Sequence, residues 1–120
     1  MTAIMSDSIT ELTKLALAFR DERDWKQFHN PKDMALSLVL EAAEVLELMQ
    51  WKNGPELQEH LARNRQKLGE ELSDVMFWVL AMSNDSGIDL GEAFKAKLVA
   101  NAKKYPIDKA KGVSTKYTEL

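Results

Sequence analysis

Residues 31–51 constrain the fold of this 120-residue chain most strongly, because they are apolar on nearly every side of a helix yet carry carboxylates in their middle. A helix that is apolar all round is normally buried. Glu41 and Glu44 interrupt this run three residues apart, so they lie on one face of the helix. The pattern predicts a buried helix that points acidic side chains into an apolar interior.

A second segment repeats this arrangement. Glu71 and Asp74 are again three residues apart, and mostly apolar residues follow them. Burying an unpaired ionised carboxylate costs several kcal/mol, and no lysine or arginine occurs at 33–51 or 69–94. A divalent cation would compensate the charge of all four acids, and oxygen ligands without His or Cys favour Mg²⁺, Mn²⁺ or Ca²⁺. The predicted metal ligands are Glu41, Glu44, Glu71 and Asp74.

Apolar spacing and helix-capping residues predict an all-α fold without strands. Ser8 and Asp89 each precede a glutamate by three residues, which is typical of a capping box, and Asn30 precedes a proline at a first helical position. The expected helical segments are 8–24, 31–51, 55–84 (as one helix or two) and 89–105, with 106–120 as a C-terminal arm. We expect a single domain over residues 1–120.

Composition narrows the class of protein. The net charge of −3 comes without a basic stripe, which argues against a nucleic-acid polymer as partner. The absence of cysteine excludes disulfides and zinc–thiolate sites and fits a cytoplasmic protein. No apolar run approaches the length needed to span a membrane, so no membrane partner is expected.

Aromatic and basic residues outside the acidic pairs suit a planar ligand that carries phosphate. Planar side chains that could stack on a base flank the second helix or follow the second acidic pair: Trp25, Phe28, His29, Trp51 and Trp78. Side chains that could hold phosphate oxygens share a face of the fourth helix: Lys97, Asn101 and Lys104. Core packing would explain the aromatics as well, and a solvated helix end would explain the lysines.

The motif Glu41-x-x-Glu44, followed after 26 residues by Glu71-x-x-Asp74, resembles the signature of MazG-like all-α nucleoside triphosphate pyrophosphatases. Further segments are similar to the dCTP pyrophosphatase branch of that family: 23–29, 41–52, 70–75, 101–106 and 116–120. This resemblance implies a four-helix MazG-like bundle completed by oligomerisation, as a homodimer or homotetramer. It implies hydrolysis of a (d)NTP, such as dCTP or a related pyrimidine dNTP, to the monophosphate and pyrophosphate.

The resemblance also assigns roles to residues. It implies Mg²⁺, with Mn²⁺ as a substitute, at the four carboxylates, and Glu41 and Glu44 are the candidates to activate the attacking water. It implies a base pocket built from Trp25, Lys26, Gln27, Phe28, His29, Trp51 and Trp78. It implies phosphate contacts from Lys97, Asn101 and Tyr105.

Three alternatives compete with this interpretation. A non-catalytic helical interaction module could use the acids as a docking surface, although docking acids belong on a polar face rather than within apolar runs. A di-iron bundle requires Glu-x-x-His pairs, and neither His29 nor His60 follows a glutamate at that spacing. Phosphoribosyl-ATP pyrophosphohydrolase uses related chemistry, but the aromatic motifs fit it less well.

Overall fold

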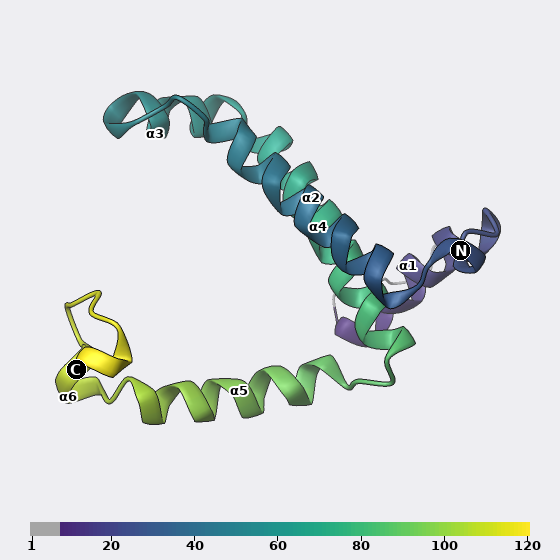
Figure 1. The fold of residues 1–120 in the computed structure, drawn as a ribbon. Helices are drawn as coiled ribbons and strands as arrows, with labels where there is room; N and C mark the ends of the chain where they lie inside the picture. Colours follow the sequence, from purple (N-terminus) through teal and green to yellow (C-terminus); the bar gives the residue numbers. More distant parts are fainter. Residues whose placement is uncertain (1–7) are drawn as a thin grey trace, which may run out of the picture. The chain divides into compact units, whose positions relative to one another are not determined.

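The computed structural model describes residues 8–120, which form helices joined by short turns and contain no strand (Figure 1). The chain divides into two compact units, one ending at Gly87 and the other spanning Ile88–Leu120. The first unit contains α1 (Ile9–Glu22), the 3₁₀ turn η1 (Lys26–Phe28), α2 (Pro31–Met49), α3 (Gly54–Arg63) and α4 (Arg65–Asp85). The second contains α5 (Leu90–Lys104), α6 (Ile107–Ala110) and η2 (Tyr117–Glu119). The all-α prediction is confirmed.

The predicted capping residues begin the helices. Ser8 Oγ accepts a hydrogen bond from the Glu11 N–H at 3.2 Å, and Asp89 Oδ1 accepts one from the Glu92 N–H at 3.0 Å. Asn30 Oδ1 accepts from the Asp33 N–H at 2.9 Å, and Pro31 occupies the first turn of α2. Each cap satisfies a backbone donor that has no partner within its helix.

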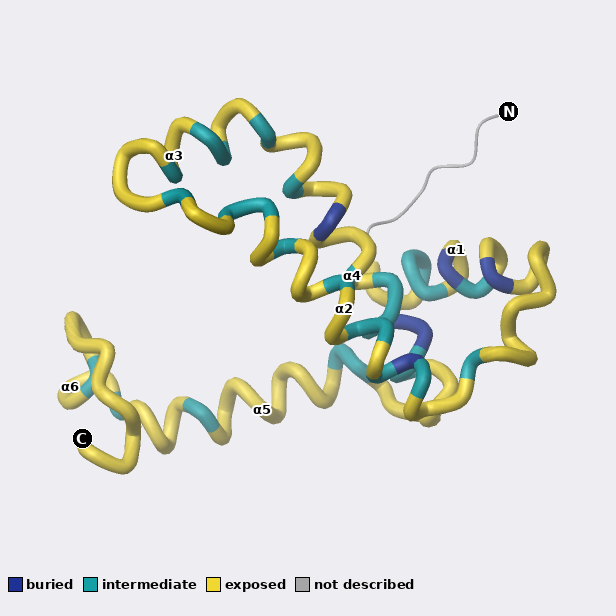
Figure 2. The backbone as a smooth tube through the Cα atoms, turned by 45° about the horizontal axis from the view of Figure 1, so that its top comes forward, coloured by how far each residue is buried: buried dark blue, intermediate teal, exposed yellow. Residues whose placement is uncertain are grey.

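The centre of the first unit is the pairing of α2 with α4, which lie side by side (Figures 1 and 2). Helix α1 packs on α4, and the buried apolar core of the unit consists of Ala16 from α1, Met34 from α2, and Leu80 and Ala81 from α4. This core is small because half of the apolar side chains of α2 remain exposed. The expectation that α2 is buried all round is therefore wrong for the single chain, since no other described helix of the unit covers its outer face.

Two connections of the first unit interrupt its helices. The 55–84 segment, which the sequence left as one helix or two, forms two helices and breaks at Asn64, whose side-chain amide donates to the His60 carbonyl at 2.8 Å. After α2, Trp51 and Gly54 both adopt the left-handed conformation, with φ of 68° and 54°.

The second unit is a helix followed by a short folded tail. The expected arm at 106–120 includes one turn of helix, α6, and the tail returns to α5. There the Tyr117 ring meets the Tyr105 ring edge-on at 5.9 Å, and Lys104 Nζ lies 4.8 Å from the Tyr117 ring centre. Among the described helices, none combines the length and apolarity that crossing a membrane requires.

Candidate metal centre and its surroundings

The structure brings the four predicted carboxylates together on the α2–α4 pair. Glu41 and Glu44 project from α2, and Glu71 and Asp74 project from α4. One carboxylate oxygen from each residue lies within 4.8 Å of the corresponding oxygens of the other three. Oxygens this close can share one small cation. Their role as metal ligands stays a prediction.

The burial of these acids differs from the expectation of a wholly apolar interior. Glu71 is buried and Glu41 is half-buried, whereas Glu44 and Asp74 are exposed. The reason is the same as for α2 as a whole, because the described residues of the unit leave part of the α2–α4 surface uncovered. The acids therefore line an open edge of the helix pair, where a ligand can reach them.

Mutual repulsion perturbs the ionisation of Glu44. Its pKa is raised to about 7, first because its protonated form donates a hydrogen bond to Glu71 and next because the charges of Glu41 and Glu71 oppose its ionisation. A raised pKa of this kind is expected where several acids lie close together with little positive charge among them. A divalent cation would supply that charge and release the proton.

Glu71 has two oxygens in different surroundings. Its Oε1 accepts a salt bridge from Lys67 Nζ at 2.9 Å, and this partner lowers the Glu71 pKa. Its Oε2 is buried and has no hydrogen-bond partner among residues 8–120. A buried oxygen without a fixed donor, inside a set of oxygen-only ligands, fits a hard divalent cation such as Mg²⁺ or Mn²⁺.

A cavity of about 380 Å³ joins this acidic cluster to aromatic side chains. Its lining consists of Phe19, Trp25, Glu41, Ser73, Asp74, Phe77 and Trp78. The rings pack edge-to-face, with centroids 5.7 Å apart for Phe19 and Trp25 and 5.1 Å apart for Phe77 and Trp78. The structure thus places the predicted Trp25 and Trp78 beside two of the acids, as a planar ligand with phosphates would require.

Sequence reasoning missed three of the residues in this region. Phe19 and Phe77 complete the aromatic lining, and their ring centroids are 6.0 Å apart. Phe77 could have been found by helical spacing, since it follows Asp74 by three residues. Phe19 gave no such local signal, because it lies on α1 and the acids lie on α2 and α4. Lys67 was missed because it lies just before the segment without basic residues, although it precedes Glu71 by four residues and so lies on the same helix face.

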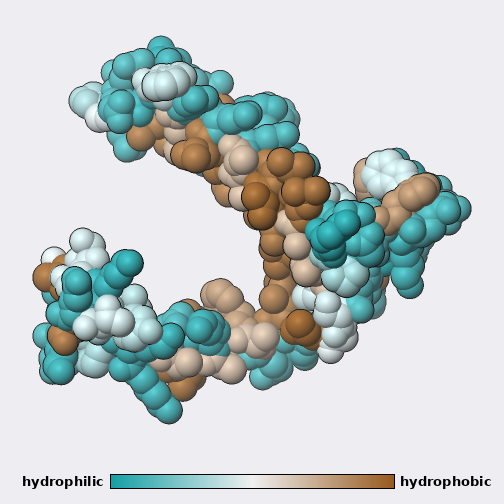
Figure 3. All heavy atoms as spheres, in the orientation of Figure 1, coloured by the Kyte–Doolittle hydropathy of each residue, from teal (hydrophilic) through white to brown (hydrophobic). Residues whose placement is uncertain are grey.

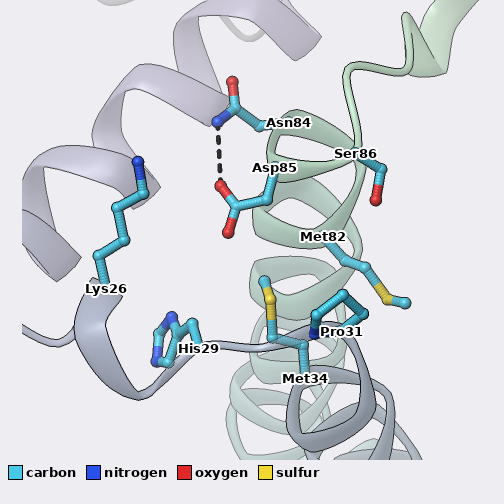
Figure 4. Close-up of a pocket in the computed structure, with 8 residues that line it drawn as sticks. All are labelled: Lys26, His29, Pro31, Met34, Met82, Asn84, Asp85 and Ser86. Carbon is cyan, nitrogen blue, oxygen red and sulfur yellow. Dashed lines mark hydrogen bonds between the residues drawn. The ribbon is translucent and has the colours of Figure 1, made fainter.

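A second hollow of about 380 Å³ lies between the η1 turn and the end of α4 (Figure 4). Lys26 and His29 approach it from one side, and Asn84 and Asp85 from the other. Asp85 also accepts a bidentate salt bridge from Arg20, with N···O distances of 2.7 and 3.1 Å. Burial lowers the His29 pKa, the Arg20 charge lowers it further, and the Asp85 charge opposes both.

The other predicted binding residues of the first unit do not line the aromatic cavity. Gln27 donates its amide to Asp24, and Phe28 is exposed. Trp51 is 86% exposed and lines a separate hollow with Leu46, Glu47 and Gln50. His29 does contact Trp78, at a centroid distance of 5.0 Å. The predicted phosphate-binding residues belong to the second unit: Lys97, Asn101, Lys104 and Tyr105.

Comparison with known proteins decides the family. Residues 36–120 match the model of the MazG-like family. The chain belongs to the MazG-like family. It is 40% identical to dCTP pyrophosphatase 1 of Homo sapiens and 37% identical to that of Bos taurus, each over 115 residues that cover 94% of this chain and 68% of the relative.

A solved structure supports the same placement within the MazG-like family. The crystal structure of a pyrophosphatase from Archaeoglobus fulgidus superposes with a TM-score of 0.78 at 34% identity, covering 88% of this chain and 99% of that one. The resemblance to the dCTP pyrophosphatase branch is therefore confirmed, and so is the MazG-like helical fold.

Proposed function

We propose that the protein is a Mg²⁺-dependent nucleoside triphosphate pyrophosphohydrolase that converts a (d)NTP, dCTP or a related pyrimidine dNTP, to the monophosphate and pyrophosphate. One observation carries the proposal: four carboxylates within 4.8 Å of one another adjoin a cavity lined by aromatic rings. Membership of the MazG-like family and the similarity to dCTP pyrophosphatases and to an archaeal pyrophosphatase support it.

Each group of residues has a distinct task in the proposed reaction. Glu41, Glu44, Glu71 and Asp74 would hold the cation, which when bound neutralises phosphate charge. Trp25, His29 and Trp78 would surround the base. Lys97, Asn101, Lys104 and Tyr105 would contact the phosphates. Water attacks the α-phosphorus, the α–β anhydride bond breaks and pyrophosphate leaves, while Glu41 or Glu44 accepts the proton of the water.

The exposed apolar face of α2 supports association with a second copy as a homodimer or homotetramer. Leu36, Val39, Leu40 and Leu46 each expose more than half of their surface. Apolar atoms also extend along α2 and α4 in Figure 3. A contiguous apolar surface of this kind is rare on a monomer. A second helix pair packed there would complete a four-helix bundle and cover the cluster.

Glu44 and Asp74 are exposed, as the acids of a non-catalytic docking surface would also be. One assay distinguishes the enzyme from such an interaction module. Pyrophosphate release is measured with a panel of dNTPs, with Mg²⁺ and with a chelator. We expect Mg²⁺-dependent release, fastest with dCTP or another pyrimidine. Loss of a group that only hydrogen-bonds to a metal ligand lowers metal affinity or activity by about 10–100-fold. Loss of a proposed ligand itself, in Asp74→Asn, should therefore lower the activity by at least about 100-fold. No release with any nucleotide would refute the proposed enzymatic activity, and equal release with the chelator would refute its dependence on Mg²⁺.

A further inference from the structure

The Lys67–Glu71 salt bridge differs from the other lysine pairs of the chain. Its N···O distance is 2.9 Å, and the side chain of Glu71 is only 7% exposed while that of Lys67 is 57% exposed. The other lysine–glutamate pair with the same spacing, Lys52–Glu56, is longer at 3.4 Å, and its glutamate is exposed. Lys67 thus directs a solvated ammonium group at a buried carboxylate.

Helix stability alone does not account for this pair. A lysine four residues before a glutamate is the less favourable order on a helix, because both charges then oppose the helix dipole. Solvent-exposed ion pairs of this spacing contribute only a few tenths of a kcal/mol. The short distance to a buried acid indicates that this ion pair acts on the carboxylate cluster rather than on the stability of the helix.

Lys67 also lies at the edge of the cluster rather than within it. Among residues 8–120 it is the one basic side chain within 4.0 Å of any of the four acids, and it reaches only Glu71. An ammonium group in the position of a shared cation would contact several of the carboxylates. The space among the four oxygens therefore stays free of it.

The two oxygens of Glu71 are consequently divided between two partners. Lys67 holds Oε1, which restricts rotation of the carboxylate, while the buried Oε2 keeps no fixed donor. We propose that Lys67 is a positioning residue for the metal centre: it fixes Glu71 by one oxygen so that the other is presented to a divalent cation. This inference rests on the metal site of the proposed function.

The test is Mn²⁺ binding to the full chain, measured by calorimetry without nucleotide for the wild type, Lys67→Met and Lys67→Arg. Removing an outer-shell partner of a ligand costs about 10–100-fold in metal affinity, so Lys67→Met should raise the Mn²⁺ dissociation constant by at least about 10-fold. Arginine keeps the donor and the charge, and Lys67→Arg should stay within about threefold of the wild type. The matched control is Lys14→Met, which removes an exposed lysine paired with Glu11 at 3.5 Å, and it should bind as the wild type does.

The outcomes separate this inference from the metal site itself. Wild-type binding with unchanged affinity in Lys67→Met would overturn the role of Lys67 alone. Tighter binding in Lys67→Met would do the same, because the ammonium would then merely repel the cation. Equal weakening in Lys67→Met and Lys67→Arg would show that a general packing defect is responsible. No saturable Mn²⁺ binding by the wild type would overturn the metal site, and the inference with it.

Discussion

The neighbours of Glu44 in the cluster perturb its charge, since its pKa is raised to about 7 through its hydrogen bond to Glu71 and the nearby charges. Replacing it by glutamine keeps a hydrogen-bond donor toward Glu71 and removes one negative charge. We expect Glu44→Gln to melt no lower than the wild type without metal at pH 8. Saturating Mg²⁺ should raise the wild-type melting temperature by several degrees and raise that of the variant by less than half as much.

Thermal melts with and without Mg²⁺ measure both effects. A variant that melts well below the wild type without metal would show that the ionised Glu44 stabilises the fold. An equal Mg²⁺-dependent increase in both proteins would remove Glu44 from the set of ligands.

His29 carries a second perturbation that can be measured residue by residue. Its pKa lies below 6.5 because of burial and the Arg20 charge, and the Asp85 charge partly offsets both. The folded protein therefore binds a proton at His29 less readily than the unfolded chain, so this residue lowers stability as pH falls below 6.5 toward the folded pKa. The Asp85→Asn variant should show a still lower His29 pKa in an NMR titration of the imidazole signals. A higher pKa in that variant would contradict the assignment of Asp85 as the opposing charge.

At the scale of elements, the Arg20–Asp85 salt bridge connects α1 to the C-terminal end of α4. Arg20 is only 2% exposed, and the Asp85 side chain is 21% exposed. The Arg20 carbonyl also accepts the Trp25 N–H at 3.1 Å, so the same residue anchors the turn that carries the predicted base-binding side chains. Because a buried guanidinium would lose its partner, Asp85→Asn should lower the free energy of unfolding by about 2–4 kcal/mol in chemical denaturation.

Asp21 provides the control for that prediction. Its carboxylate lies 3.8 Å from Arg20 Nε but is 63% exposed. Asp21→Asn should therefore change the free energy of unfolding by less than about 1 kcal/mol. Equal losses in the two variants would mean that the total negative charge near Arg20, rather than the bidentate geometry, stabilises the contact.

Local signals in the sequence predicted the helices and the two acidic pairs, because each of these depends on residues close together in the chain. Asn30 and Asp89 cap the helices that they were expected to begin, and each acidic pair lies on one helix face because its members are three residues apart. Contacts between distant segments were not predictable in this way. Arg20 and Asp85 are 65 residues apart, and nothing in local spacing pairs them. The exposure of α2 was missed because an apolar sequence does not tell whether its own chain or a second copy covers it.

At the scale of the whole molecule, the outer face of α2 remains to be covered, and its apolar side chains predict association. Val39 exposes 64% of its surface on that face. Burying a valine side chain contributes about 1.5–3 kcal/mol to the free energy of association. A glutamate at this position would instead place a charged group in the interface. We expect Val39→Glu to weaken association by more than about 10-fold in each contact. The variant should sediment as a smaller species than the wild type at the same concentration. Its activity should fall as the oligomer dissociates.

Glutamate is a better helix former than valine, so the variant does not disfavour α2 itself. The control is Gln58→Glu, which adds the same charge at an exposed polar position of α3, and it should sediment as the wild type does. If Val39→Glu keeps the wild-type sedimentation coefficient, the outer face of α2 does not join two copies. If it dissociates while full activity persists, the carboxylate cluster works within one chain and needs no second copy to cover it.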